Sequence, residues 1–198
     1  LLQWTQEQEI QLIVDESFVD FSDDFEYNTL LLNKILEENP HLVVMKSISK
    51  SYGVPGLRLG VLASADVELI RRIRKDISIW NINSFAEFYM QIFGKYEKEY
   101  KQACRQFIAE RQRFEKLLKE IPYLHLIPTQ ANFFCLEITD KYSSAELTKL
   151  LLERYNIMVK DCNSKTSLQG RNFIRISVRD QKDNDVLIAA LWELCYAK

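Results

Sequence analysis

Apolar residues recur along the chain in two patterns, and each pattern predicts a different kind of element. Short apolar runs or alternations, typical of strands, occupy residues 10–14, 42–45, 57–63, 124–127, 132–138, 157–160 and 173–178. Spacings of three and four, typical of helices with one buried face, occupy residues 30–38, 65–77, 143–155 and 182–196. Strands mixed with helices in this way predict an α/β fold.

One helical stretch is too long for an ordinary globular helix. Apolar residues continue at this spacing from Phe85 to Ile121, and only Gly94 interrupts them. Pro122 ends the stretch, because proline cannot continue a helix. We therefore expect more than one structural role within it.

Composition narrows the class of protein. The 198 residues are 47% hydrophobic, enough for one large core or two small ones, and the net charge of −2 leaves no basic surface for nucleic acid. No apolar run approaches the roughly 20 residues of a membrane span. The four cysteines are widely spaced and the chain has only two histidines, which predicts reduced thiols and no metal site. A soluble, cytoplasmic protein acting on small molecules is expected.

The most informative stretch runs from Ser47 to Gly60. Its fourteen positions hold three serines, three glycines, Lys50 and Arg58, directly after the apolar run 42–45. Serine hydroxyls and glycine-exposed backbone N–H groups can bind phosphate oxygens, an arginine can add a charge-assisted fork, and a lysine amine can bond to an aldehyde. An anion held beside a reactive amine suggests pyridoxal 5'-phosphate as cofactor.

This stretch resembles the cofactor-lysine segment of fold-type I pyridoxal-phosphate enzymes, in particular the histidinol-phosphate aminotransferase-like branch of the class I and II aminotransferases. Three more stretches resemble motifs of that family, in the family's order: residues 14–21 (VDESFVDF), 130–134 (QANFF) and 173–178 (FIRISV). Any one of these motifs alone would be a weak signal. Four of them, spread across nearly all of the chain, make the resemblance specific.

The resemblance implies roles around the cofactor. Lys50 resembles the lysine that bonds the cofactor and then moves the substrate's proton, and Asp15 resembles the acid that pairs with the protonated pyridine nitrogen. Ser47, Ser49 and Arg58 resemble the ligands of the cofactor phosphate. Phe18 departs from the family, because many relatives have a tyrosine there whose hydroxyl donates to the cofactor's phenolic oxygen.

The resemblance also implies a substrate site. Arg175 resembles the arginine that binds the substrate's α-carboxylate, and its planar fork suits that role. An arginine flanked by apolar strand residues needs an anionic partner or water in any case. Asn132, in the QANFF motif, is assigned to the same substrate site.

The fold implied is the second half of a pyridoxal-phosphate-dependent transferase large domain, a mostly parallel sheet with helices, followed by a small α+β C-terminal domain. We place these domains at residues 1–100 and 101–198, with the boundary inside the long helical stretch. Relatives carry a comparable length before the aspartate motif, and this chain begins with Leu1 rather than methionine. We therefore expect a piece of a longer protein that is inactive by itself.

The reaction expected is amino transfer between an amino acid and a 2-oxo acid or other carbonyl acceptor, catalysed by a homodimer when the protein is full length. Two alternatives stay open. Asp-Glu-x-Phe-x-Asp-Phe at residues 15–21 also resembles threonine-phosphate decarboxylases, which act on a phosphorylated amino acid. A non-catalytic, aminotransferase-like binding or regulatory module is the second alternative.

Overall fold

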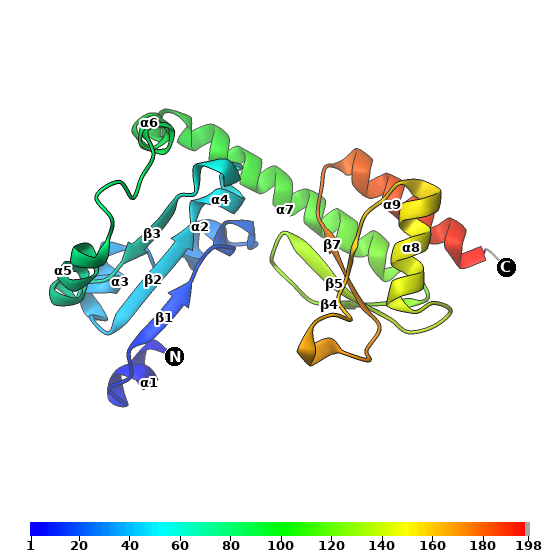
Figure 1. The fold of residues 1–198 in the computed structure, drawn as a ribbon, viewed down its shortest axis with the longest axis horizontal. Coiled ribbons are helices and arrows are strands. Elements are labelled where there is room, and N and C mark those ends of the chain that lie inside the picture. The colour runs from blue at the N-terminus through cyan, green and yellow to red at the C-terminus, as the bar shows by residue number, and fades with distance from the viewer. Residues whose placement is uncertain (197–198) are drawn as a thin grey trace. The chain divides into compact units, whose positions relative to one another are not determined.

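A computed structural model describes residues 1–196 of the chain (Figure 1). These residues form two compact units: the first unit is Leu1–Cys104, and the second unit begins at Arg105. The division falls within helix α7 (Glu97–Lys119), inside the long helical stretch of the sequence. That the units correspond to two domains divided after residue 100 stays a prediction.

The first unit is built on a three-stranded sheet in the order β1-β2-β3, with β1 parallel and β3 antiparallel to β2. β2 is the central strand, and Leu42, Val43 and Val44 are buried within it. The helices and strands of the first unit are α1 (Leu2–Glu7), β1 (Leu12–Asp15), η1 (Val19–Phe21), α2 (Phe25–Asn28), α3 (Asn33–Glu38), β2 (Leu42–Ser47), α4 (Ile48–Ser51), η2 (Pro55–Leu57), β3 (Gly60–Ala63), α5 (Val67–Asp76), α6 (Ser84–Phe93) and η3 (Gly94–Tyr96).

Two predicted elements of this unit begin three residues later than expected. The helix predicted at 30–38 starts at Asn33, because the Glu16 carboxylate accepts hydrogen bonds from Leu30 N and, at 2.8 Å, from Thr29 Oγ1, and so holds the preceding backbone outside the helix. The strand predicted at 57–63 starts at Gly60. The turn η2 precedes it, and Arg58 adopts the left-handed conformation with φ 58°.

The second unit packs helices against one face of an antiparallel sheet in the order β4-β5-β7-β6. The strands are β4 (Leu124–Ile127), β5 (Phe133–Ile138), β6 (Lys160–Asp161) and β7 (Phe173–Ser177). Alternate residues of β5 and β7 point into a core that they share with the end of α7, with α8 (Ser144–Tyr155) and with α9 (Gln181–Tyr196). The other face of the sheet carries Arg175, which lies opposite Ile174 and Ile176 as predicted.

The strand predicted at 157–160 is wrong for residues 157–159, and only Lys160 begins β6. Helix α8 ends at a left-handed Asn156, and the N–H of Ile157 bonds back to the Leu151 carbonyl at 3.0 Å. Ile157 and Val159 nevertheless pack against the core. These residues are therefore apolar because they pack against the core, although they form no β-strand.

Candidate active site

Asp15 ends β1 with an exposed carboxylate that neighbouring groups hold in its ionised form. Oδ1 of Asp15 accepts from the backbone N–H of Ser17 at 2.9 Å and also from the Ser17 hydroxyl. These two hydrogen bonds, the hydroxyl first, lower the pKa of Asp15, and the positive charge of Lys50 lowers it further. An acid held ionised at the carboxyl end of a strand is suited to pair with a cationic ring nitrogen.

Lys50 lies in the short helix α4, which directly follows β2, and its side chain is exposed. Its Nζ lies 4.2 Å from the centroid of the Phe18 ring, in cation–π contact. Hydrogen bonds join the two segments, because the Ser17 hydroxyl donates to Asp15 and accepts from the backbone N–H of Ser47 at 2.9 Å, three residues before Lys50. The structure thus brings together three of the predicted residues: Asp15, Phe18 and Lys50.

The residues predicted to bind the cofactor phosphate lie in different surroundings. Ser47 ends β2, and its backbone N–H donates to Ser17 Oγ at 2.9 Å, so it joins the same cluster as Asp15. Ser49 is buried beside Lys50, with 8% of its surface exposed. Arg58 is exposed and its guanidinium donates to the Pro55 carbonyl at 3.3 Å. Phosphate binding by Ser47, Ser49 and Arg58 stays a prediction.

Sequence reasoning missed a buried ion pair in this unit. Nζ of Lys46 lies 2.7 Å from Oδ1 of Asp20, and the two side chains are 10% and 8% exposed. Tyr52 lies against the pair, with Lys46 Nζ at 5.8 Å from its ring centroid, and stacks on Tyr100. The recurring acidic residues of segment 15–21 could have indicated this pair in the sequence, because an aspartate beside a buried phenylalanine needs a partner.

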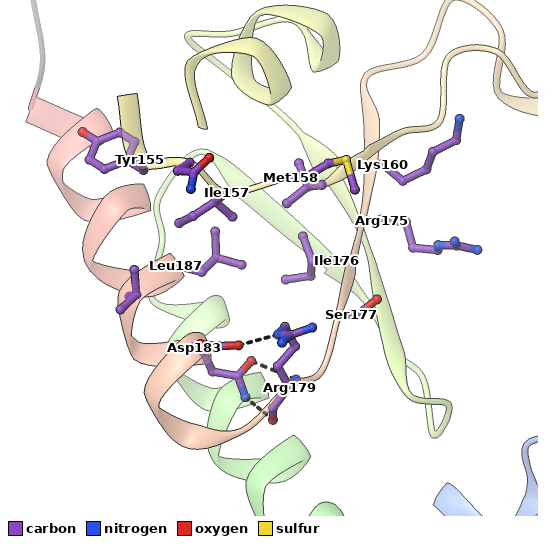
Figure 2. Close-up of a pocket in the computed structure, with 14 residues that line it drawn as sticks. Tyr155, Ile157, Met158, Lys160, Arg175, Ile176, Ser177, Arg179, Asp183 and Leu187 are labelled. Atoms are coloured by element: carbon purple, nitrogen blue, oxygen red, sulfur yellow. Dashed lines mark hydrogen bonds and ion pairs between the residues drawn. The ribbon is translucent and has the colours of Figure 1, made fainter. Parts of the chain in front are cut away.

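The second unit presents two cations on the outer face of its sheet. Arg175 of β7 pairs in register with Lys160 of β6 on one side and with Cys135 of β5 on the other. The Arg175 guanidinium lies 5.1 Å from the centroid of the Phe133 ring. Within residues 1–196, neither Arg175 nor Lys160 forms an ion pair with a carboxylate. Figure 2 shows both side chains extending to the same side of the strands.

A cavity of about 690 Å³ adjoins these cations (Figure 2). Its walls are the segment 155–160, the end of β7 and the start of α9. Asn184 is part of the lining; it is buried, accepts from the Arg179 backbone N–H at 3.0 Å and donates to the Arg179 carbonyl at 2.9 Å. The cavity is therefore a preformed hollow with Arg175 and Lys160 in its lining.

Asn132 precedes β5, and its carbonyl accepts from the N–H of Val178 at 3.0 Å. The nearby loop is held by Arg111, which is 1% exposed and donates to the Thr129 carbonyl at 2.9 Å. These contacts fix the backbone of the QANFF motif. A substrate role for the Asn132 side chain stays a prediction.

Two further observations concern residues 1–196. None of their helices is long and apolar enough to cross a membrane. Over the same range, no group of three or more histidine, cysteine, aspartate or glutamate side chains is arranged to hold a metal ion.

Comparison with models of protein families identifies the family of this chain. The model of the family "Aminotransferase class I and II" matches residues 1–191, and the chain belongs to that family. Pyridoxal 5'-phosphate is the cofactor of this family, which confirms the cofactor expected from the lysine motif at the level of the family. The residues fit it, since Lys50 offers an exposed amine and Asp15 an ionised acid nearby.

The similar proteins differ in their reactions. The chain is 34% identical to a CMP-5'-(3-aminopropyl)phosphonate synthase of Streptomyces rubellomurinus, with 94% of this chain and 29% of that protein covered. It is 32% identical to an L-serine phosphate decarboxylase of Sulfurospirillum multivorans (91% and 46% covered) and 31% identical to a threonine-phosphate decarboxylase of Salmonella typhimurium (92% and 48% covered). The chain spans half or less of the length of these relatives.

Solved structures confirm the predicted fold class. A decarboxylase from Sulfurospirillum multivorans matches with a TM-score of 0.84 and 30% identity, covering 95% of this chain and 48% of that one. The histidinol-phosphate aminotransferase from Clostridium acetobutylicum matches with a TM-score of 0.85 and 25% identity, covering 98% and 57%. Both similarities support the expected assignment to a partial transferase fold.

Proposed function

We propose that this chain serves the pyridoxal-phosphate-dependent decarboxylation of a phosphorylated amino acid. This revises the order of preference from the sequence, where amino transfer came first. The serine-phosphate and threonine-phosphate decarboxylases among the relatives support the change. The structural observation that supports it is the pairing of Arg175 with Lys160 on the outer face of the sheet.

Two adjacent cations match a substrate with two anionic groups. Like charges on directly opposed strand residues destabilise a sheet unless an anion lies between or beside them. A phosphorylated amino acid carries a carboxylate and a phosphate, and each can accept charge-assisted hydrogen bonds. We assign the carboxylate to Arg175, whose planar fork matches it, and the phosphate to Lys160 as a point charge.

Other side chains would have the following roles. The bound cofactor supplies a ring that accepts the electron pair of the breaking bond to the carboxyl carbon. Asp15, held ionised by Ser17, would keep the ring nitrogen protonated. Lys50 would bond the cofactor before the substrate arrives, and its ammonium would then donate a proton to the α carbon in place of the carbon dioxide lost. Phe18 would hold the Lys50 ammonium in place through its ring face.

Product analysis of the full-length protein tests this proposal. The purified protein, saturated with pyridoxal 5'-phosphate, is given O-phospho-L-serine or O-phospho-L-threonine labelled at the carboxyl carbon. We expect labelled carbon dioxide and the phosphorylated amine in equal amounts, with no need for a 2-oxo acid. Retention of the carboxyl label, with amino transfer that depends on a 2-oxo acid, would contradict decarboxylation.

Amino transfer is the second candidate, and the similarity to histidinol-phosphate aminotransferases favours it. It needs the same Lys50, Asp15 and Arg175, and differs in which bond to the α carbon breaks. The same product analysis separates the two reactions. A non-catalytic module would give neither labelled carbon dioxide nor an amino-transfer product, so the same analysis also separates it from both reactions.

The homodimer expected for the full-length protein is also a proposal. Several large apolar side chains of the first unit are exposed, among them Ile79, Trp80 and Phe85 at 80% or more. Large apolar side chains gathered in one segment are typical of an interface. Sedimentation equilibrium of the full-length protein would reveal twice the chain mass if the proposal holds and the single chain mass if it does not.

A further inference from the structure

The buried ion pair of Asp20 and Lys46 contributes little to stability by itself. Taking two charges out of water costs about as much free energy as their attraction returns. The pair is also incomplete, because Asp20 Oδ2 is buried and has no hydrogen-bond partner among the described residues 1–196. A buried polar group kept under such conditions indicates a role other than stability.

The position of the pair suggests that role. Asp20 lies two residues after Phe18 in one segment, and Lys46 lies four residues before Lys50 in another. The pair therefore joins the segment that carries the Phe18 ring to the segment that carries the Lys50 amine. A second tie joins the same two segments, since Ser47 N donates to Ser17 Oγ at 2.9 Å.

Aromatic side chains lie beside the pair, whose own side chains are only 10% and 8% exposed. The Tyr52 ring lies near Lys46 and stacks on Tyr100 with 4.3 Å between ring centroids and 20° between ring planes. Burial, followed by the charge of Asp20, raises the pKa of Tyr52 to about 12, so its hydroxyl stays neutral. Because the pair is buried, the attraction between Asp20 and Lys46 is less sensitive to salt. The pair therefore restrains the two segments from sliding past each other.

We propose that Asp20 and Lys46 are positioning residues for Lys50: their ion pair holds residues 16–21 against residues 46–50, and so fixes where the Lys50 amine lies above the Phe18 ring. This inference rests on the proposed function, in which Lys50 bonds the cofactor. Reacting groups must be held within about 0.5 Å of their productive position. A flexible four-carbon side chain meets that requirement only when its backbone and its contact surface are both fixed.

The rate at which Lys50 captures the cofactor tests the proposal. Full-length protein freed of cofactor is mixed with pyridoxal 5'-phosphate. The C=N bond, formed with loss of one water, is reduced by borohydride at successive times, and peptide mass mapping measures the label on Lys50. In Lys46→Met/Asp20→Leu, apolar side chains of similar size replace the pair, so the fold is retained. We expect capture by Lys50 to be about tenfold slower in this variant.

Two comparisons separate positioning from general damage. Lys46→Arg keeps the charge pair, and we expect it to capture cofactor within about threefold of the original rate. The matched control is Lys119→Met/Glu115→Leu, which removes an ion pair of 2.6 Å from the second unit and is expected to leave the rate unchanged. Thermal unfolding midpoints are recorded for every variant.

The outcomes are distinct. An unchanged rate of Lys50 labelling in folded Lys46→Met/Asp20→Leu overturns the positioning role and leaves the proposed function intact. If that variant does not fold, Lys46→Gln/Asp20→Asn, which removes both charges and keeps hydrogen-bonding side chains in the same places, is expected to slow capture about threefold, and an unchanged rate there overturns the role equally. Absence of label on Lys50 in the unmodified protein defeats the proposed function itself.

Discussion

The two units hold their chemically active side chains by different means. Around Lys50 in the first unit, the neighbouring buried side chains include polar ones that are tied by hydrogen bonds or charge, namely Glu16, Ser17, Asp20 and Lys46. In the second unit, Arg175 stands on the outer face of a sheet whose inner face is a continuous apolar core. Position is thus set by polar ties in one unit and by packing in the other.

The difference predicts opposite responses to mutation. In the first unit, polar substitutions near Lys50 should change chemistry more than they change folding. In the second unit, core substitutions should change folding, whereas substitutions on the outer face should change only substrate binding. Each of the following predictions tests one side of this comparison.

The largest effect is expected for Lys50→Ala in the full-length protein. Loss of the group that bonds cofactor and moves the proton should lower kcat by at least about 10³-fold. Because Lys50 is exposed and its contact with Phe18 is worth only about 0.5–1 kcal/mol, the thermal midpoint should change little. Lys34→Ala, another exposed lysine of the same unit, is the control and should leave both quantities unchanged. Full activity in Lys50→Ala would refute the assignment.

The second prediction concerns the core of the second unit. Phe134 is fully buried and packs edge-to-face on Phe114, with 5.8 Å between ring centroids. Phe134→Ala should lower the free energy of unfolding of this 198-residue chain by about 3–5 kcal/mol. Urea unfolding followed by circular dichroism measures it. Ile13→Ala changes a strand residue of the first unit that is 60% exposed, and it should lower the free energy of unfolding by less than about 0.5 kcal/mol. Equal losses would contradict the dependence of the second unit's stability on its packed core.

The third prediction concerns the outer face of that same unit. Arg175→Ala should lower kcat/KM for the anionic substrate about 10- to 100-fold, the equivalent of about 1.5–3 kcal/mol for hydrogen bonds to a charged group. Stability should change by less than about 1 kcal/mol, since only the contact with Phe133 is lost. Arg171→Ala is a close control, because Arg171 is also exposed and lies 4.7 Å from the Phe173 ring centroid. Similar kinetic losses in both variants would remove the special role of Arg175.

The sequence identified the family and most elements because its motifs are local. The lysine segment and the alternation around Arg175 are each contained in one short run of neighbouring residues. The pair of Asp20 and Lys46 was missed because it joins positions 26 residues apart, and a charge next to an apolar run is by default assigned to the surface.

Two local conformations of the first unit were also missed. The start of α3 depends on the Glu16 carboxylate, which comes from a different element. Arg58 adopts the left-handed backbone conformation, which residues other than glycine rarely take, so the conformational preference of arginine does not indicate it. Neither feature has a signature in the neighbouring sequence.

The smallest effect, and the most direct comparison of the two units, is a shift in acid titration. The pKa of Asp15 is depressed below its ordinary value of 3.8, first by the Ser17 hydroxyl. Its contribution to stability is therefore complete above pH 3.8 and is lost as the pH falls through the lower, folded value. Ser17→Ala should raise the titration midpoint of the Asp15 carboxyl, followed by carbon-13 NMR, and should make the loss of stability below pH 4 shallower.

Ser143→Ala supplies the matched control in the second unit. Its backbone N–H donates to the Glu146 carboxylate at 2.8 Å and its hydroxyl at 2.7 Å; the backbone bond first, and then the hydroxyl bond that the variant removes, lower the pKa of Glu146. This variant should raise the midpoint of Glu146 alone, just as Ser17→Ala should raise that of Asp15 alone. Only the Asp15 shift should be accompanied by slower cofactor capture at Lys50, because Ser17 also binds the backbone of Ser47 ahead of that lysine. A normal capture rate in Ser17→Ala would show that this hydroxyl tunes the acid without positioning the amine.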